Sequence, residues 1–289
     1  DYSWFRDSPS SGLALWQIHW ILSADALAAP HGLDLLTPPA PPEMPKLPST
    51  PDKALMQSYD AWYLKRYDKL KANIDINSEA IAAKIDREQA EGAELATACK
   101  NGDPTAIKRL MLTTLVRHQL PEPLALEAKF ALDSTSRIAL CTIEVPDLAR
   151  LPLLKERGAG WKAKWLDVPA TEKKRSSELI LYALCIRAAY LVAVADPGGF
   201  FDTVTVNAHQ KWFDPATGGA REGIVASLQA TKDELCQLKP GHLDPKACFR
   251  HLNGISTPNI LDAAPVRPIF VMDTNDNRIV ANRDVASEL

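Results

Sequence analysis

The sequence lacks the short motifs that mark many enzyme sites. Its 289 residues contain no phosphate-binding glycine-rich loop, no Gly-x-Ser-x-Gly elbow and no His-Glu-x-x-His helix. The formal net charge is only −3, so no global charge draws the chain to nucleic acid or to an anionic membrane, and any such binding has to be local. The residues themselves therefore show no convincing catalytic site.

Cysteines and uninterrupted apolar runs are also scarce. The five cysteines are odd in number and mostly lie in apolar runs, which indicates reduced thiols in a cytoplasmic protein rather than a disulfide framework. No stretch approaches 18 uninterrupted apolar residues. The richest one, residues 12–29, is interrupted by polar side chains and predicts an amphipathic helix rather than a membrane span. The cysteines are Cys99, Cys141, Cys185, Cys236 and Cys248.

Proline divides the chain into segments. Seven prolines within residues 37–51 predict a stiff, extended linker, which separates an N-terminal amphipathic helical segment, residues 1–36, from the rest. A narrow apolar stripe at helical spacing then predicts a helical arm over residues 52–101. The arm either pairs as a short coiled coil or lies along the main domain, and we expect self-association or a protein partner at residues 52–98. The remainder, residues 102–289, forms the main domain.

The main domain mixes helical and strand periodicity, which predicts an α+β fold with a mainly antiparallel sheet and packed helices. Asp103 followed by Pro104 predicts a helix start. An apolar helix is predicted over residues 177–195, and the Asp-Pro pair at 244–245 begins a short helix that ends at Gly254. Alternation predicts strands over residues 124–132, 161–168 and 202–213. A nearly continuous apolar run predicts a central strand over residues 137–145. Turn residues at 214–219 predict a hairpin that a strand over residues 222–229 completes.

Glu127 and Lys129 form a Glu-x-Lys pair on the first predicted strand, like half of the metal site in restriction-type nucleases. Such a site also needs an upstream acid on a neighbouring strand, so that two carboxylates hold Mg²⁺. Asp103 is the candidate acid, and the sequence already uses it as a helix cap. Strand alternation also places Glu127 and Lys129 on the polar face, opposite the leucines. We interpret the pair as surface residues.

The basic stretch at residues 155–175 is the candidate binding site. It holds seven cations against three acids, and Trp161 and Trp165 alternate with its lysines, a composition suited to gripping a phosphate backbone and stacking on bases. The alternative is solvated surface charge with both tryptophans in the core. The candidate DNA-binding residues are Lys155, Arg157, Lys162, Lys164, Lys173, Lys174 and Arg175.

A metal site can be assembled on paper from Cys236, His242, Cys248 and His251. Their spacing matches no common zinc pattern, and Cys248 lies among apolar neighbours. The sequence therefore predicts no metal ligands.

Four segments carry a family resemblance: "IALCTIEVPDLARLP", "TVTVNAHQKWFDPATGGAREGIVASLQATKDEL", "LDPKACFRHLNGISTP" and "APVRPIFVMD". In this order and spacing, the chain resembles, over about residues 52–280, the region that precedes the nuclease domain in bacterial Mrr-type restriction-endonuclease-like proteins. The resemblance implies cleavage of foreign or modified DNA by a Mg²⁺-dependent domain, which we expect after Leu289. It assigns no catalytic residue to this sequence, which begins at Asp1 and which we expect to be part of a longer protein.

We therefore predict a non-catalytic, cytoplasmic module that senses DNA or positions an effector in a bacterial restriction or anti-phage defence protein. It contacts double-stranded DNA through the basic stretch and binds no cofactor itself. Mg²⁺ and any endonuclease activity belong to an attached or partner nuclease domain. The alternative function is an interaction scaffold that oligomerises through the helical arm without contacting DNA.

Overall fold

The computed structural model divides the chain into two compact units, residues 1–33 with 98–289 and residues 34–97. The N-terminal segment, which the sequence sets apart from the main domain, is therefore grouped with it. The residues described are 13–14, 18, 21–23, 27, 83–84, 86–87, 90–118, 120, 123–157, 164–196, 198–214, 216–262, 264–272 and 279–280.

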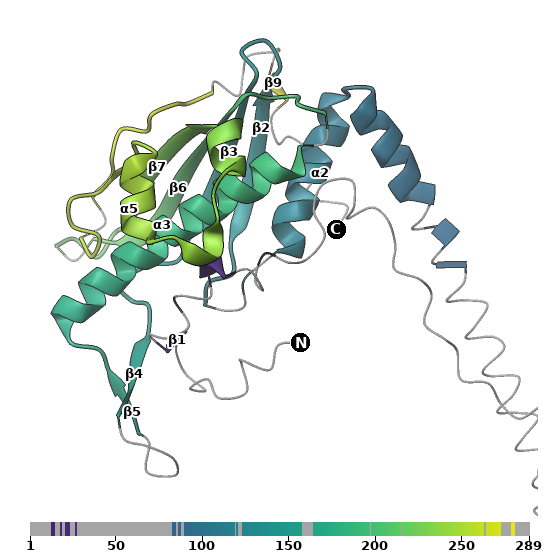
Figure 1. Ribbon diagram of the computed structural model, residues 1–289. Helices are drawn as coiled ribbons and strands as arrows, with labels where there is room; N and C mark the ends of the chain where they lie inside the picture. The colour runs from purple at the N-terminus through teal and green to yellow at the C-terminus, as the bar shows by residue number, and fades with distance from the viewer. Residues whose placement is uncertain are drawn as a thin grey trace, which may run out of the picture. The chain divides into compact units, whose positions relative to one another are not determined.

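A six-stranded sheet forms the centre of the larger unit, and its strand order is β8-β7-β6-β3-β2-β9 (Figure 1). Every neighbouring pair is antiparallel except β3 and β6, which run parallel and are connected through α3. The predicted α+β class with a mainly antiparallel sheet is confirmed. The strands are β2 (Glu127–Asp133), β3 (Ile138–Val145), β6 (Thr203–Phe213), β7 (Ala220–Thr231), β8 (Ile255–Ser256) and β9 (Ile279–Val280), and α3 is Ala170–Ala195.

One predicted strand belongs to a different sheet from the one expected. The alternation at residues 161–168 gives β5 (Lys164–Asp167), which pairs with β4 (Leu153–Arg157) rather than with the main sheet. Strand β4, which sequence analysis missed, also pairs in parallel with β1 (Leu13–Ala14), so these strands form a separate three-stranded sheet. Alternation reports which face of a strand is apolar, but it does not identify the strand's partner.

The amphipathic helix predicted over residues 12–29 is wrong for the residues described there. Leu13–Ala14 is a strand, while Ile18, Ile21, Leu22 and Leu27 lie in 3₁₀ turns. All four of these turn residues are buried. Short turns thus bury the same apolar side chains that suggested a helical face.

Period-2 alternation gives the main sheet one apolar and one polar face. Phe130, Cys141, Val206 and Leu228 lie in register across four strands and are buried. The adjacent row, on the opposite face, consists of Lys129, Thr142, Asn207 and Ser227. Burial of each large side chain in the apolar row contributes about 2 kcal/mol.

Helix α3 covers the apolar face of this sheet (Figure 1). Burial raises the pKa of the Cys141 thiol on β3 and of the Cys185 thiol on α3 to about 12, and Cys141 also acts electrostatically on Cys185. By length and composition α3 could span a membrane, since its most apolar window has a mean hydropathy of 1.9. However, 78% of that window is buried inside the protein, as in a core helix.

Helix α3 begins seven residues earlier than predicted. The sequence places its start at 177, near Ser176 or Ser177, whereas the helix begins at Ala170 after Pro169. Both serines are buried within the helix. The first two turns are rich in charge and carry little apolar periodicity, so the hydrophobic pattern begins only at the third turn. This earlier start places the end of the basic stretch on a helix.

The predicted helix caps are confirmed at two Asp-Pro starts. Asp103 accepts hydrogen bonds from the first turn of α2 (Pro104–Arg117), and Asp244 accepts one from Ala247 N in α5 (Pro245–His251). Two further short helices are α4 (Lys232–Cys236), which begins with a capping box, and the 3₁₀ helix η6 (Pro240–His242).

The end of α5 differs in detail from the prediction. Asn253, not Gly254, has the positive φ, 55°. Its N–H donates to Arg250 O, while Gly254 N–H donates to Phe249 O, which is the Schellman pattern. Gly254 is required by close approach, because a Cβ there would lie 2.5 Å from atoms of the Phe249 ring.

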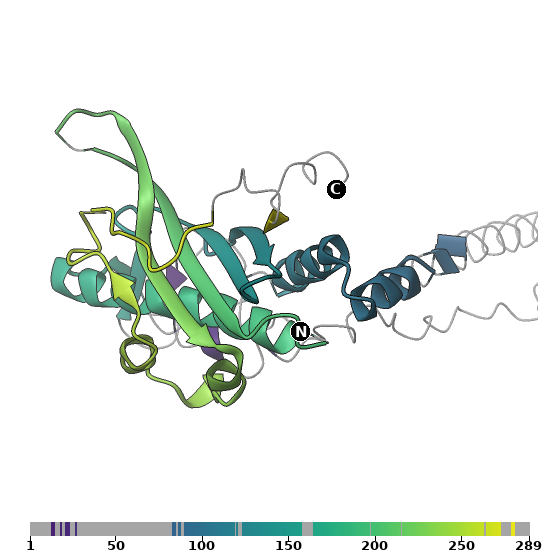
Figure 2. The same ribbon diagram turned by 90° about the horizontal axis from the view of Figure 1, so that it is seen from above.

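The segment at residues 264–272 lies over the polar face of the main sheet, where Figure 2 shows it crossing β7 and β6. Val266 N–H donates to Ile224 O at 2.7 Å. Ile269 N–H donates to Ser227 Oγ, and the Asn207 side chain donates to Phe270 O. Asn207 and Ser227 are buried in consequence.

Most of the predicted arm at residues 52–101, and the whole of the proline-rich linker, lie outside the described residues. Within the arm, residues 83–84, 86–87 and 90–100 are helical, as expected. Self-association through residues 52–98 stays a prediction.

Arg187 ties three distant segments together inside the larger unit. Its guanidinium donates to the carbonyl of Ile21 at 2.8 Å and to that of His118 at 2.7 Å. The residue is only 3% exposed, and this burial lowers the pKa of Arg187 to about 10. The N-terminal segment and the end of α2 are thereby attached to the middle of α3.

We expect Arg187→Ala to lower the free energy of unfolding by about 3 kcal/mol, because two buried carbonyls lose their donor. Urea denaturation followed by circular dichroism measures this. The control Arg175→Ala, on an exposed part of the same helix, should change stability by less than about 0.5 kcal/mol. Equal midpoints for the two variants would show that the Arg187 contacts do not stabilise the fold.

Candidate functional site

The first turns of α3 present a charged face to solvent. Thr171, Lys174, Arg175 and Glu178 follow one another at spacings of three, one and three residues, which places them on one side of a helix. Beyond them, from Ile180 onward, most of the helix is buried. The helix is thus anchored by its apolar length and exposes polar residues only near its beginning.

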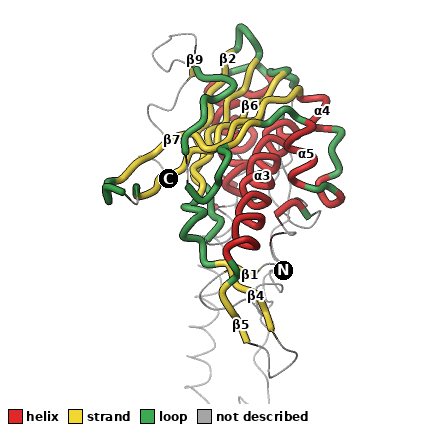
Figure 3. Tube along the Cα trace, turned by 90° about the vertical axis from the view of Figure 1, so that its left-hand side faces the viewer, coloured by secondary structure: helices red, strands yellow, loops and turns green. Residues whose placement is uncertain are grey.

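Helix α5 packs beside this part of α3 (Figure 3). The Tyr182 ring on α3 stacks on the Phe249 ring on α5, with centroids 4.4 Å apart. The Tyr182 hydroxyl is also 3.0 Å from Ser256 Oγ, just beyond α5. The neighbouring Cys248 is buried as well. These contacts fix the position of α5 against α3.

An open groove of about 400 Å³ lies between the two helices. Four cationic and two acidic side chains line it, so its local charge is +2, although the whole chain is negative. The lining residues are Thr171, Lys174, Arg175, Glu178, Leu179, Asp244, Lys246, Ala247 and Arg250.

The two acids in the groove already have partners within the protein. Glu178 forms an ion pair with Lys246 across the groove, with 2.8 Å between Oε2 and Nζ. Asp244 caps α5 through Ala247 N at 2.7 Å. In contrast, Lys174, Arg175 and Arg250 make no ion pair within the described part of the chain. Three cations are therefore available to an anionic ligand.

The structure distributes the predicted basic residues among different roles. Lys174 and Arg175 line the groove. Lys155 pairs with Glu172, and Lys173 donates to the Ala149 carbonyl at 2.7 Å, so both support the fold. Of the other three residues, Arg157 and Lys164 are paired in register on β4 and β5, where only their backbone is described, and Lys162 lies outside the described residues.

Sequence reasoning missed Lys246 and Arg250, which complete the groove. The predicted Asp-Pro start of α5 places these two residues one helical turn apart, so their common face was visible in the pattern. The pattern did not show that this face meets Lys174 and Arg175, about 70 residues away in sequence. That contact depends on the packing of Phe249 against Tyr182.

Glu127 and Lys129 are exposed on the polar face of β2, as predicted. Glu144, the register partner of Glu127, forms a 2.6 Å ion pair with Lys211, and these contacts raise the pKa of Lys211. No group of three histidine, cysteine or acidic residues suited to a metal is found among the described residues. The described residues therefore give the Glu-x-Lys pair no metal partners.

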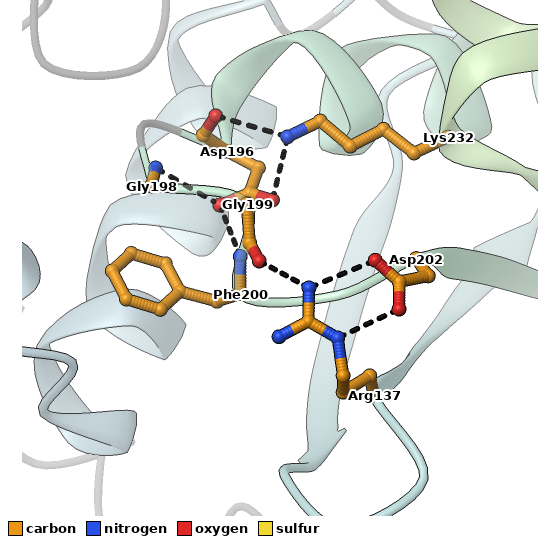
Figure 4. A network of polar contacts seen from close by, with 7 residues as sticks. All are labelled: Arg137, Asp196, Gly198, Gly199, Phe200, Asp202 and Lys232. Atoms are coloured by element: carbon orange, nitrogen blue, oxygen red, sulfur yellow. Dashed lines mark hydrogen bonds and ion pairs between the residues drawn. The ribbon is translucent and has the colours of Figure 1, made fainter.

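A polar network follows α3 and is centred on Asp196 (Figure 4). This carboxylate accepts hydrogen bonds from the N–H groups of Gly198 and Phe200, at 3.4 and 3.1 Å, and lies 2.7 Å from Lys232 Nζ. The Asp196 side chain is fully buried. The network links the end of α3 to the start of α4, which indicates a structural role.

Arg137 joins the same region to the turn between β2 and β3 (Figure 4). It donates to both carboxylate oxygens of Asp202, at 2.6 and 2.8 Å, and to the Gly199 carbonyl. These hydrogen bonds hold the pKa of Asp202 below its ordinary value and raise the pKa of Arg137. Both groups have partners, so this network offers no free ligand-binding group.

The comparisons with known proteins identify no relative. No model of a known protein family matches the chain, and neither the curated proteins nor the solved structures contain a significant match. The chemistry of the basic groove is thus the main structural guide to function.

We expect the Arg137–Asp202 ion pair to stabilise the fold at neutral pH and to lose this effect in acid. The pKa of Asp202 is lower in the folded protein than its ordinary 3.8, so the stabilisation is complete above that value and disappears as the pH falls through the folded-state pKa. Asp202→Asn should therefore lower the Tm by about 2 °C at neutral pH.

The difference in Tm between wild type and Asp202→Asn should become smaller at about pH 3 and below. Thermal unfolding across a pH series measures it. Asp167→Asn, at an exposed position on β5, is the control and should leave the Tm nearly unchanged. A difference between wild type and Asp202→Asn that stays constant with pH would contradict the assignment.

Proposed function

We propose that this chain is a non-catalytic, DNA-contacting module of a bacterial restriction or anti-phage defence protein. Its contact with double-stranded DNA is the groove between α3 and α5. The observation that carries the proposal is the convergence of Lys174, Arg175 and Arg250, three cations without an acidic partner in the described part of the chain. Phosphate oxygens are the natural ligands of such a cluster.

The distribution of charge supports a local contact. The chain as a whole is negative, so the protein has no general attraction for polyanions. The groove collects cations from two helices, and Glu178 neutralises only one of them, Lys246. The groove is therefore a local positive site on a chain of negative net charge, as a local contact with nucleic acid requires.

The choice of DNA among polyanions, and of defence as the context, rests on the sequence resemblance to Mrr-type proteins. That resemblance supports the proposal without naming any residue of the groove. In this role the chain senses DNA or positions an effector, and the Mg²⁺-dependent cleavage is performed by an attached or partner nuclease domain. We place the protein in the cytoplasm, in keeping with its cysteine usage.

Some of the basic residues support the fold and are therefore unsuitable for a test of DNA binding. Lys173 is excluded, because it supports the loop at Ala149 and its loss would disturb the fold. Lys155 is excluded because it pairs with Glu172. Lys174, Arg175 and Arg250 are the remaining cations of the groove without a described partner, so their removal separates DNA binding from folding.

We expect the triple variant Lys174→Gln, Arg175→Gln, Arg250→Gln to bind duplex DNA on the order of 100-fold more weakly than wild type. Because three cations that neutralise phosphate charge are lost, the slope of log affinity against log salt should become shallower by about 2 to 3. Fluorescence anisotropy with a labelled duplex, over a salt series, measures both quantities.

The matched control is Arg109→Gln, Lys129→Gln, Lys239→Gln, which removes the same charge from exposed positions elsewhere. Equal loss of affinity in the two triple variants would contradict a site in the groove. A wild-type protein that binds no DNA but self-associates regardless of salt would instead support the scaffold function, because an apolar interface depends little on salt.

A further inference from the structure

We propose that the groove recognises a terminal phosphate, the phosphomonoester at the end of a nucleic-acid strand, in preference to the internal phosphodiester backbone. This inference rests on the proposed function and names the part of the DNA that the groove binds. The charge, the donor types and the position of the groove support it.

The charge of the groove matches a terminal phosphate. With Glu178 neutralising Lys246, the residues left are Lys174, Arg175 and Arg250 against Asp244, a net charge of +2. A phosphomonoester carries a charge of about −1.5 to −2 near neutral pH, whereas each phosphodiester carries a single negative charge. One terminal phosphate therefore balances the groove by itself.

The donors come from two helices and suit a group that is accessible from several sides. Arg175 on α3 and Arg250 on α5 each offer a planar fork of N–H donors, which pairs well with two phosphate oxygens. Lys174 adds a point charge. A terminal phosphate presents three free oxygens and can meet donors from both helices together. An internal phosphodiester has two, because its other oxygens continue the chain.

The groove also lies beside the start of α3. Thr171, in the first turn of the 26-residue α3, lines the groove, and the Pro169 cap supplies no side-chain hydrogen bond to that turn. The start of a long helix carries a partial positive charge that favours phosphate. The groove volume of about 400 Å³ is within the range of small-molecule sites, so it accommodates a terminal phosphate together with the nucleoside that carries it.

The test compares three duplexes of equal sequence: linear with 5′-phosphates, linear with 5′-hydroxyls, and closed into a circle without ends. We expect the full chain to bind the phosphorylated duplex about tenfold more tightly than the other two, in competition against a labelled phosphorylated probe. Arg250→Gln should reduce this preference to less than about threefold. Lys239→Gln, the control, should retain it.

The outcomes separate this inference from the proposed function. If all three duplexes bind equally, and the triple groove variant binds them all weakly, DNA binding stands and the preference for ends is overturned. A nucleoside monophosphate serves as a fourth probe, by calorimetry. If it binds wild type but not the triple variant, while no duplex binds, the phosphate site stands and the DNA function is wrong. If neither it nor any duplex binds, both are wrong.

Discussion

The guanidinium of Arg187 lies inside the larger unit, where it donates to main-chain carbonyls of the N-terminal segment and of the end of α2. A charge in this position is costly unless its hydrogen bonds are satisfied, and the lowered pKa of Arg187 reflects that cost. The contact therefore favours one arrangement of three segments. It fixes the middle of α3. The buried length of this helix packs against the sheet, and its first turns line the groove.

The groove depends on this anchoring because the exposed turns at the start of α3 hold charged side chains and little apolar surface. Their position is determined by the buried length of the helix, and the partner helix α5 is held by the stack of Phe249 on Tyr182. The Asp196 and Arg137 networks fix the other end of α3, where the chain turns into β6. Satisfied networks stabilise the fold, whereas the cations without partners are the groups available for binding.

Local sequence patterns predicted much of the architecture. Alternation located β2 and β6, a nearly continuous apolar run located β3, and turn residues located the hairpin strand β7. The two Asp-Pro pairs located the starts of α2 and α5. These signals work because pleating and capping involve residues close together in the chain. The pattern was wrong where the decisive contact was distant. It assigned β5 to the wrong sheet, missed β4, and predicted a helix near residue 13, where β1 pairs with β4.

The candidate site shows the same difference between local signals and contacts of distant residues. By itself the sequence determined that residues 173–175 are basic, that Glu127 and Lys129 face solvent, and that Lys246 and Arg250 share a helical face, since composition and period are local properties. Only the tertiary structure decided that Lys173 supports a loop while Lys174 and Arg175 meet Arg250 across a groove. That selection depends on the packing of α5 against α3, and contacts between residues about 70 positions apart leave no periodic signal in the sequence.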